Sequence, residues 1–145
     1  RVNIMTQEEI MKLVTSKDGY IGHAMNIPHD RQNKTHELVL EYNQTSPADT
    51  KRGQDLLKQI LGTYNERVVI QHGVHFDFGL NTHLLGMTYV NFGVTFLDTS
   101  PITIGDMCFI APGVILTCAG HPVVAEQKDQ GIETSKPITI GNSVG

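Results

Sequence analysis

The chain has 145 residues, a mass of 16.0 kDa and a formal net charge of -4, so it can hold one ordinary domain or a small cap with a repeat body. Its isoelectric point near 5.9 and its lack of a basic run give no electrostatic reason to expect a nucleic acid or an anionic membrane as partner. The sequence has two cysteines, no apolar run long enough to span a bilayer and no signal-peptide pattern at its start. We therefore expect a cytoplasmic protein without a disulfide framework.

The N-terminal part of the chain has the pattern of short amphipathic helices. Thr6 stands three positions before Glu9 and is followed by apolar residues at helical spacing, which is typical of a capping box. This pattern predicts a helix over residues 7 to 16. Apolar residues among polar ones predict a second helix within residues 30 to 42.

A third helix has the strongest local signals. Ser46 is a candidate N-cap, Pro47 a candidate first helical residue, and Gly62 a plausible stop. After this helix the composition changes to β-forming residues. We therefore predict two domains, a helical cap over residues 1–65 and a β body over residues 66–145.

The β body is built on a six-residue repeat. Residues 104 to 121 divide into three lines of six, each opened by an aliphatic residue and each containing turn-compatible or small residues. Glycine and proline inside the units exclude a helical stripe, and the pattern is typical of a β-helix with three short faces and 18 residues in each coil. Leu84 opens an earlier coil, 20 residues before Ile104, so we expect residues 98–101 to bulge at a corner.

The repeat is interrupted once. Its phase is lost after His121 and returns at Ile140. This interruption predicts a loop from residue 122 to about residue 139 that extends from the β-helix. A loop of this length in a compact repeat is usually functional or mobile. The sequence reaches Gly145 one hexapeptide into a new coil, so we expect the β-helix to be truncated there or its open end to be covered by something else.

Three stretches together resemble a known family. They are Tyr-Val-Asn-Phe at 89–92, Ile-Gly-Asp with Ile-Ala-Pro at 104–112, and Gly-His-Pro at 120–122, followed by the loop. With the helical cap, they resemble the maltose/galactoside O-acetyltransferase family of hexapeptide-repeat acyltransferases. Hexapeptides alone are a weak signal, because γ-class carbonic anhydrases, nucleotidyl-sugar enzymes and serine acetyltransferases use the same coil. The Gly-His-Pro tripeptide and the loop after it are more specific.

The resemblance implies a mainly β fold, a left-handed parallel β-helix with an N-terminal α-helical cap, assembled as a homotrimer. It implies transfer of an acetyl group from acetyl-coenzyme A to a hydroxyl of a sugar or similar small acceptor, with no metal. In the family, further coils build much of the coenzyme groove. We therefore expect most cofactor-binding residues to lie beyond Gly145.

The resemblance also assigns residues to roles. His121 matches the general base, which removes the proton of a hydroxyl that is a poor nucleophile at neutral pH. Glu133 matches a loop glutamate that can orient the imidazole. Asn91 matches an acceptor-site asparagine that can also stabilise an oxyanion. Asp77 and Asp98 match positions expected to bind the acceptor.

Two other functions compete with this one. A chain without the coenzyme groove could be a non-catalytic structural trimer. A γ-class carbonic anhydrase would need zinc held by histidines, for which His72, His75 and His83 are the candidates, although their spacing alone is not convincing.

Overall fold

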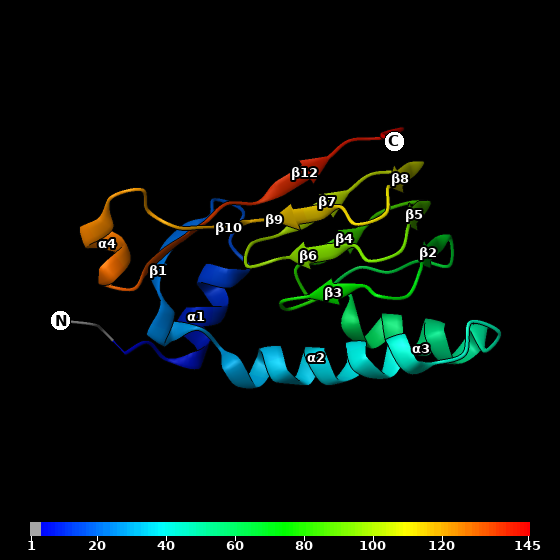
Figure 1. Ribbon diagram of the computed structural model, residues 1–145, viewed down its shortest axis with the longest axis horizontal. Helices are drawn as coiled ribbons and strands as arrows, with labels where there is room; N and C mark the ends of the chain where they lie inside the picture. The colour runs from blue at the N-terminus through cyan, green and yellow to red at the C-terminus, as the bar shows by residue number, and fades with distance from the viewer. Residues whose placement is uncertain (1–3) are drawn as a thin grey trace.

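Helices α2 and α3 lie along one side of a stack of short parallel strands in the computed structural model, which describes residues 4–145 (Figure 1). The helical elements are α1 (Gln7–Val14), η1 (Ala24–Asn26), α2 (His29–Gln44), α3 (Thr50–Ile60) and α4 (Ala125–Asp129). Within the described residues no helix is long and apolar enough to cross a membrane.

The strands of the body form three parallel sheets, ordered β2-β5-β8, β3-β6-β9 and β4-β7-β12, so the chain moves from one sheet to the next in each coil. Their bounds are β2 (Val68–Ile70), β3 (His75–Phe76), β4 (Thr82–Leu84), β5 (Thr88–Val90), β6 (Thr95–Leu97), β7 (Ile102–Ile104), β8 (Cys108–Ile110), β9 (Ile115–Thr117) and β12 (Ile138–Ile140). A mainly β architecture with parallel sheets is therefore confirmed.

Three corners join the sheets. The first corner leads from the β2-β5-β8 sheet to the β3-β6-β9 sheet, the second from there to the β4-β7-β12 sheet, and the third back to the β2-β5-β8 sheet. Each corner recurs from coil to coil. The first comprises residues 71–74, 91–94 and 111–114; the second 77–81, 98–101 and 118–137; and the third 85–87 and 105–107.

The coil repeat is 20 residues, not the predicted 18. Val68 pairs with Thr88, and Thr88 pairs with Cys108, 20 positions further along. The bulge expected at residues 98–101 lies at the second corner. It is not a local irregularity, because the second corner is also wide in the preceding coil, at residues 77–81.

Buried polar side chains fill the wide second corner. Asp98 accepts hydrogen bonds from the Phe78 amide at 2.8 Å and from the Thr82 hydroxyl at 2.9 Å. The Asn81 side chain donates to the carbonyl oxygens of Asp98 and, in α1, of Val14 at 3.0 and 2.7 Å. These bonds satisfy backbone groups that the corner takes out of the strand ladders, and they attach α1 to the body.

The inside of the coil is apolar. Stacked aromatic rings, with Phe76 and Phe96 centroids 4.8 Å apart, continue the core from one coil to the next. The cap joins the same core through Leu56, Leu57 and Ile60 of α3, all nearly fully buried.

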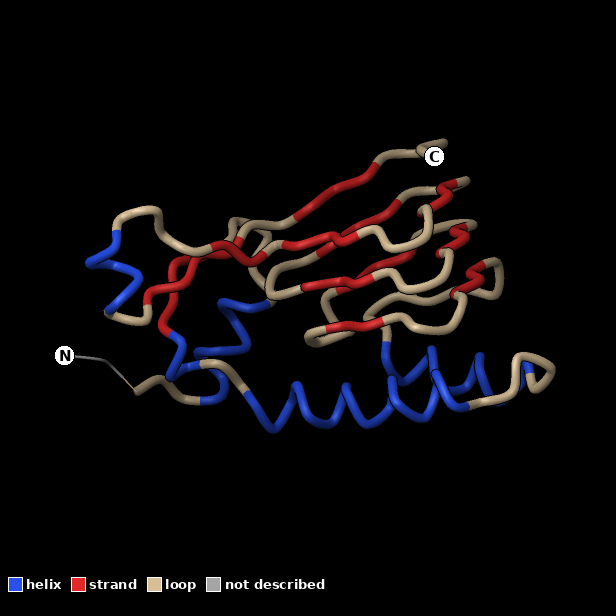
Figure 2. The backbone as a smooth tube through the Cα atoms, in the orientation of Figure 1, coloured by secondary structure: helices blue, strands red, loops and turns tan. Residues whose placement is uncertain are grey.

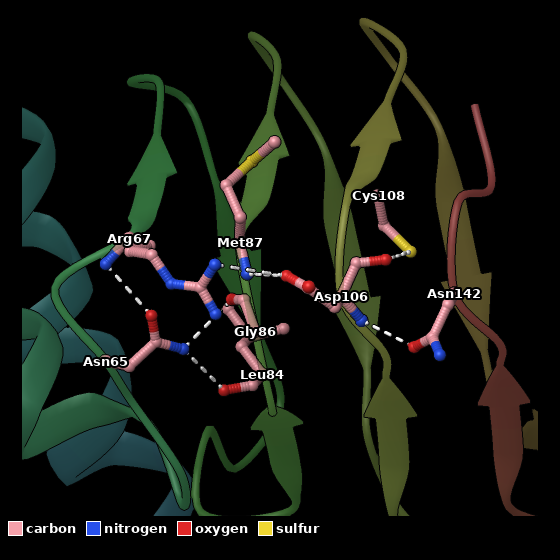
Figure 3. A network of polar contacts seen from close by, with 8 residues as sticks. All are labelled: Asn65, Arg67, Leu84, Gly86, Met87, Asp106, Cys108 and Asn142. Carbon is pink, nitrogen blue, oxygen red and sulfur yellow. Dashed lines mark hydrogen bonds and ion pairs between the residues drawn. The ribbon is translucent and has the colours of Figure 1, made fainter.

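The third corner is held by a ladder of polar contacts (Figure 3). Asp106 accepts a hydrogen bond from the Met87 amide at 2.7 Å, and its own amide donates to the Asn142 side chain at 2.8 Å. Each coil thus bonds the one before and the one after it. Gly105 permits the close approach, because a Cβ there would lie 2.3 Å from Asn142 Oδ1.

Two of the predicted helices are confirmed, and the start of the third is wrong. The α1 capping box is present, with Glu9 N donating to Thr6 Oγ1 at 3.2 Å. Helix α3 begins at Thr50, because Asp49 is its N-cap and accepts from Arg52 N at 3.2 Å. The predicted cap, Ser46, instead forms a turn before the helix.

Candidate functional site

The segment between residues 121 and 138 leaves the second corner but is not a free loop. It contains α4 and strand β11 (Ile132–Ser135), which lies antiparallel between β10 (Ala119–Gly120) and β1 (Tyr20–His23). Figure 2 shows this ribbon of strands leading away from the parallel sheets toward α4. The predicted loop is therefore corrected to a helix and a strand, which the cap holds through β1.

His121 opens onto a cavity at this ribbon. The cavity has a volume of about 320 Å³ and contains Glu133 in its wall, so the structure brings these two predicted residues together. Its lining residues are Ala24, His121, Lys128, Gly131, Ile132 and Glu133. His121 itself is exposed, so a small molecule can reach the imidazole from solvent.

A cluster of ionisable groups continues from Glu133 toward the coil. Burial raises the pKa of Asp77, the charge of His36 lowers it, and the charge of Glu133 raises it further. Burial also raises the pKa of Tyr20, and the charges of Glu133 and Asp77 add to this effect. The Tyr20 hydroxyl donates to the Thr99 carbonyl oxygen at 2.9 Å. Asp77 therefore lies within electrostatic range of Glu133, in a partly buried position.

Asp77 also lines a second, larger cavity between α2 and the β3-β6-β9 sheet. That cavity has a volume of about 440 Å³, with His36 and His75 in its wall. Asp77 lines this cavity and Glu133 lines the His121 cavity, and the charge of Glu133 acts on Asp77. A polar small molecule near His121 would thus meet the Glu133 carboxylate, whereas Asp77 lines the other cavity.

Asn91 is not brought to the same place within one chain. It lies at the first corner, before β6, where its side chain accepts from the Phe92 amide at 2.8 Å. His121 lies beyond the end of β9, at the second corner. The two residues stand at opposite ends of the β3-β6-β9 sheet.

Asp98 does not face a cavity. Its side chain is fully buried, and both carboxylate oxygens accept hydrogen bonds from the corner itself. Burial raises its pKa to about 6, against the lowering effect of the bonds from Phe78 and Thr82. The expected contact of Asp98 with the acceptor is thus corrected to a structural role, because the corner surrounds the carboxylate.

The three histidines of the zinc hypothesis have separate surroundings. His72 Nε2 bonds the Thr45 carbonyl oxygen at 2.8 Å, and His83 Nδ1 bonds the Thr63 hydroxyl at 2.8 Å. His75 projects outward from β3. Across residues 4–145 no three His, Cys, Asp or Glu side chains are grouped so that they could hold a metal ion.

Sequence alone did not predict the residues that β1 and the start of η1 contribute. Tyr20, His23 and Ala24 all lie in a segment without periodicity, and a strand of four residues is too short to give a pattern of its own. The one available signal was a Tyr-Ile pair followed by glycine. Among the residues lining the His121 cavity, Lys128 is the one lysine or arginine, and it could meet an anionic group of a ligand.

Comparison with protein families identifies the cap. Residues 28–65 match the family described as the maltose acetyltransferase hexapeptide capping motif. This span includes α2 and α3 and ends just before β2.

Comparison with curated proteins identifies relatives over about two thirds to three quarters of the chain. Over 107 residues the chain is 38% identical to galactoside O-acetyltransferase of Escherichia coli (strain K12), covering 74% of this chain and 53% of that protein. It is 34% identical to nodulation protein L of Rhizobium leguminosarum bv. viciae over 100 residues, covering 69% and 53%. The chain thus spans about half the length of the curated relatives it matches first.

Solved structures share the fold over nearly the whole chain. A galactoside acetyltransferase in complex with coenzyme A superposes with a TM-score of 0.82 and 32% identity, covering 97% of this chain and 68% of that one. A maltose O-acetyltransferase from Clostridium difficile 630 gives a TM-score of 0.81 and 27% identity, covering 98% and 78%.

Proposed function

Because this chain belongs to the maltose/galactoside O-acetyltransferase family of hexapeptide-repeat acyltransferases, we propose that it transfers an acetyl group from acetyl-coenzyme A to a hydroxyl of a sugar or similar small acceptor. The observation that carries the proposal is the shared cavity of His121 and Glu133 at the second corner. A solved relative binds coenzyme A, which supports this choice of acetyl donor.

His121 is the general base of the proposed reaction. The acceptor oxygen attacks the thioester carbonyl, His121 takes the hydroxyl proton, and the same proton then goes to the departing thiolate of coenzyme A. This role needs one ring nitrogen free to accept. Glu133, in the same cavity wall, is the group that would hold the other nitrogen protonated and stabilise the imidazolium.

Asp77 and Asn91 are proposed to bind the acceptor. Asp77 is partly buried beside the charges of His36 and Glu133, so a sugar hydroxyl could donate to it away from bulk water. Asn91 can donate its side-chain amide to an acceptor or to the oxyanion. Since Asn91 and His121 lie at opposite ends of one sheet, we propose that a site using both is formed between two copies of the chain.

The proposed assembly is a homotrimer of left-handed β-helices, each with a helical cap over residues 1–65 and a β-helical body over residues 66–145. Exposed apolar side chains at the first corner and at the start of the strand after it support an intersubunit contact: Phe92 is 58% and Ile115, in β9, 64% exposed. In a trimer with closed symmetry, the first corner of each copy would meet the second corner of a neighbouring copy. Lys128 is the proposed contact for an anionic part of coenzyme A.

An acetyl-transfer assay tests the function. Thiol released from acetyl-coenzyme A is measured with galactosides, maltose and glucose as acceptors, and the acetylated sugar is identified by mass. Acceptor-dependent thiol release with an O-acetyl product is the expected result. Thiol release that does not depend on any hydroxyl acceptor would indicate hydrolysis in place of transfer, and no release at all would favour a structural role for the chain.

A further inference from the structure

His23, at the end of β1, bonds the chain on both sides of its imidazole ring. Nδ1 accepts a hydrogen bond from the Met25 amide at 3.0 Å, and Nε2 lies 2.5 Å from the Gln130 carbonyl oxygen. A backbone amide can only donate and a carbonyl can only accept. The neutral ring with its proton on Nε2 satisfies both, so His23 donates to Gln130.

The Gln130 contact falls where α4 turns into β11. Gly131 follows at a φ of +75°, and its carbonyl oxygen accepts from the Ala24 amide at 2.9 Å. The His23 ring covers this turn so closely that a Cβ on Gly131 would lie 2.9 Å from Nε2. Glycine is required here both by the backbone conformation and by the ring.

The same contacts build the wall of the His121 cavity. Apart from His121, the lining residues are Ala24, which follows His23, and members of α4, the turn and the start of β11. Glu133 is the residue of β11 that pairs with Gly22, next to His23. The position of Glu133 relative to His121 therefore depends on how firmly the turn is held to β1.

We propose that His23 is a positioning residue of the active site: through Gln130 and Gly131 it fastens the α4-β11 turn to β1 and so sets where Glu133 lies beside His121. This inference rests on the proposed acetyl transfer for its catalytic consequence. How firmly His23 holds the turn to β1 can be measured separately, without any substrate.

Two amide variants separate the two bonds of His23. An asparagine amide ends about where Nδ1 lies, so His23→Asn keeps an acceptor for the Met25 amide but is too short to reach Gln130. A glutamine amide is longer, so His23→Gln can still donate to Gln130 while it loses the Nδ1 acceptor. If the contact with Gln130 positions the turn, His23→Gln must resemble the unaltered protein more than His23→Asn does.

Hydrogen exchange of the backbone amides in residues 124–134 measures the turn directly. We expect His23→Asn to raise their exchange rates by about threefold to tenfold, as loss of one hydrogen bond does, with a smaller rise for His23→Gln. Gly131→Ala should raise them at least as much, because its Cβ displaces the ring. Gly113→Ala is the control for backbone strain alone, since its φ is +72° and no atom lies within 4 Å of its Cβ.

Steady-state kinetics then test the catalytic consequence. His23→Asn should lower kcat by about threefold to tenfold with a smaller rise in the KM for acetyl-coenzyme A, because the turn leads directly to Glu133, whereas Lys128 lies on α4. Unchanged exchange in His23→Asn would overturn the fastening of the turn. Faster exchange with unchanged kcat, or equal effects of Asn and Gln, would overturn the positioning role.

The two hypotheses fail in different ways. If the unaltered protein transfers no acetyl group to any hydroxyl acceptor, the proposed function fails, and with it the catalytic part of the role of His23. The exchange rates of His23→Asn and His23→Gln still decide whether His23 holds the turn.

Discussion

The carboxylate of Asp98 and the hydroxyl of Thr82 are bonded at 2.9 Å inside the second corner, where both residues are fully buried. The same carboxylate accepts from the Phe78 amide. A wide corner in a three-sided coil leaves backbone groups without strand partners, and a buried carboxylate supplies acceptors for them. The cost is an acid held away from water.

This cost should appear as a pH dependence of stability. Burial raises the pKa of Asp98 from 3.8 to about 6. Between these values the unfolded chain releases a proton that the folded chain keeps, so the contribution of Asp98 to the free energy of unfolding falls as pH rises through this window and stays low above it. Asp98→Asn keeps an acceptor for Phe78 and removes the charge. It should therefore raise the free energy of unfolding at neutral pH by about 1 to 3 kcal/mol.

Urea unfolding from about pH 4 to about pH 7 measures this effect. The gap between Asp98→Asn and the unaltered protein should open as pH rises and become constant above about pH 6. A gap that does not change with pH would mean that Asp98 is not a buried acid of raised pKa.

A second stability prediction concerns the third corner. Gly105 and Gly141 occupy equivalent places, since Ile104 pairs with Ile140. A Cβ on Gly105 would lie 2.3 Å from Asn142 Oδ1 and 3.0 Å from the Gly141 backbone, whereas no atom lies within 4 Å of a Cβ on Gly141. We expect Gly105→Ala to cost about 1 to 3 kcal/mol and Gly141→Ala less than about 0.5 kcal/mol. Equal costs in thermal unfolding would show that the coils can separate to accept the methyl group.

The six-residue period of the sequence predicted the strands well, because the aliphatic residue that opens each line must face the inside of the coil. The 20-residue coil was harder to predict. Asp98 and Asn81 look like ordinary turn residues in a sequence, and nothing local shows that their side chains point inward to satisfy a wide corner. The start of α3 was wrong because Ser46 and Asp49 both have the chemistry of an N-cap, and only the packing of the helix decides between them.

The candidate site was predictable in the same uneven way. His121 and Glu133 could be chosen from their motif, and the structure places both at one cavity. The strand that holds Glu133 in place could not be predicted, because β1 and β11 are far apart in the sequence and each has four residues. Strand pairing between such short segments depends on tertiary contacts and not on local propensity.

Loss of the general base should nearly abolish acetyl transfer. We expect His121→Ala to lower kcat by about 100-fold to 10,000-fold, because the acceptor hydroxyl then keeps its proton during attack. Thermal unfolding should not change, since His121 is exposed. His29→Ala is the matched control, because His29 is also exposed but lies at the start of α2. Unchanged turnover in His121→Ala would remove this residue from the mechanism.

Glu133→Gln should have a smaller effect than His121→Ala. The glutamine still offers an oxygen to the imidazole but no longer stabilises its positive charge, so kcat should fall by about tenfold to 100-fold. The comparison uses the same acetyl-transfer assay at saturating acetyl-coenzyme A. A loss equal to that of His121→Ala would mean that Glu133 takes part directly in proton transfer.

Assembly is the last prediction, and it starts from the separation of Asn91 and His121 on one chain. If both act on one acceptor, the first corner of one copy must meet the second corner of another, and Phe92, which is 58% exposed, would be buried between them. We expect sedimentation to give a species of three times 16.0 kDa. Phe92→Glu should dissociate it and lower acetyl transfer together, because a charge in an apolar contact is costly.

Ile4→Glu is the control for this variant, since Ile4 is 87% exposed at the other end of the chain and should affect neither measurement. A single species near 16.0 kDa at micromolar concentration that still consumes acetyl-coenzyme A with a sugar acceptor would contradict the intersubunit site. Asn91 and His121 could then not contact the same acceptor, and acceptor binding would have to depend on Asp77 and Glu133 of the same chain.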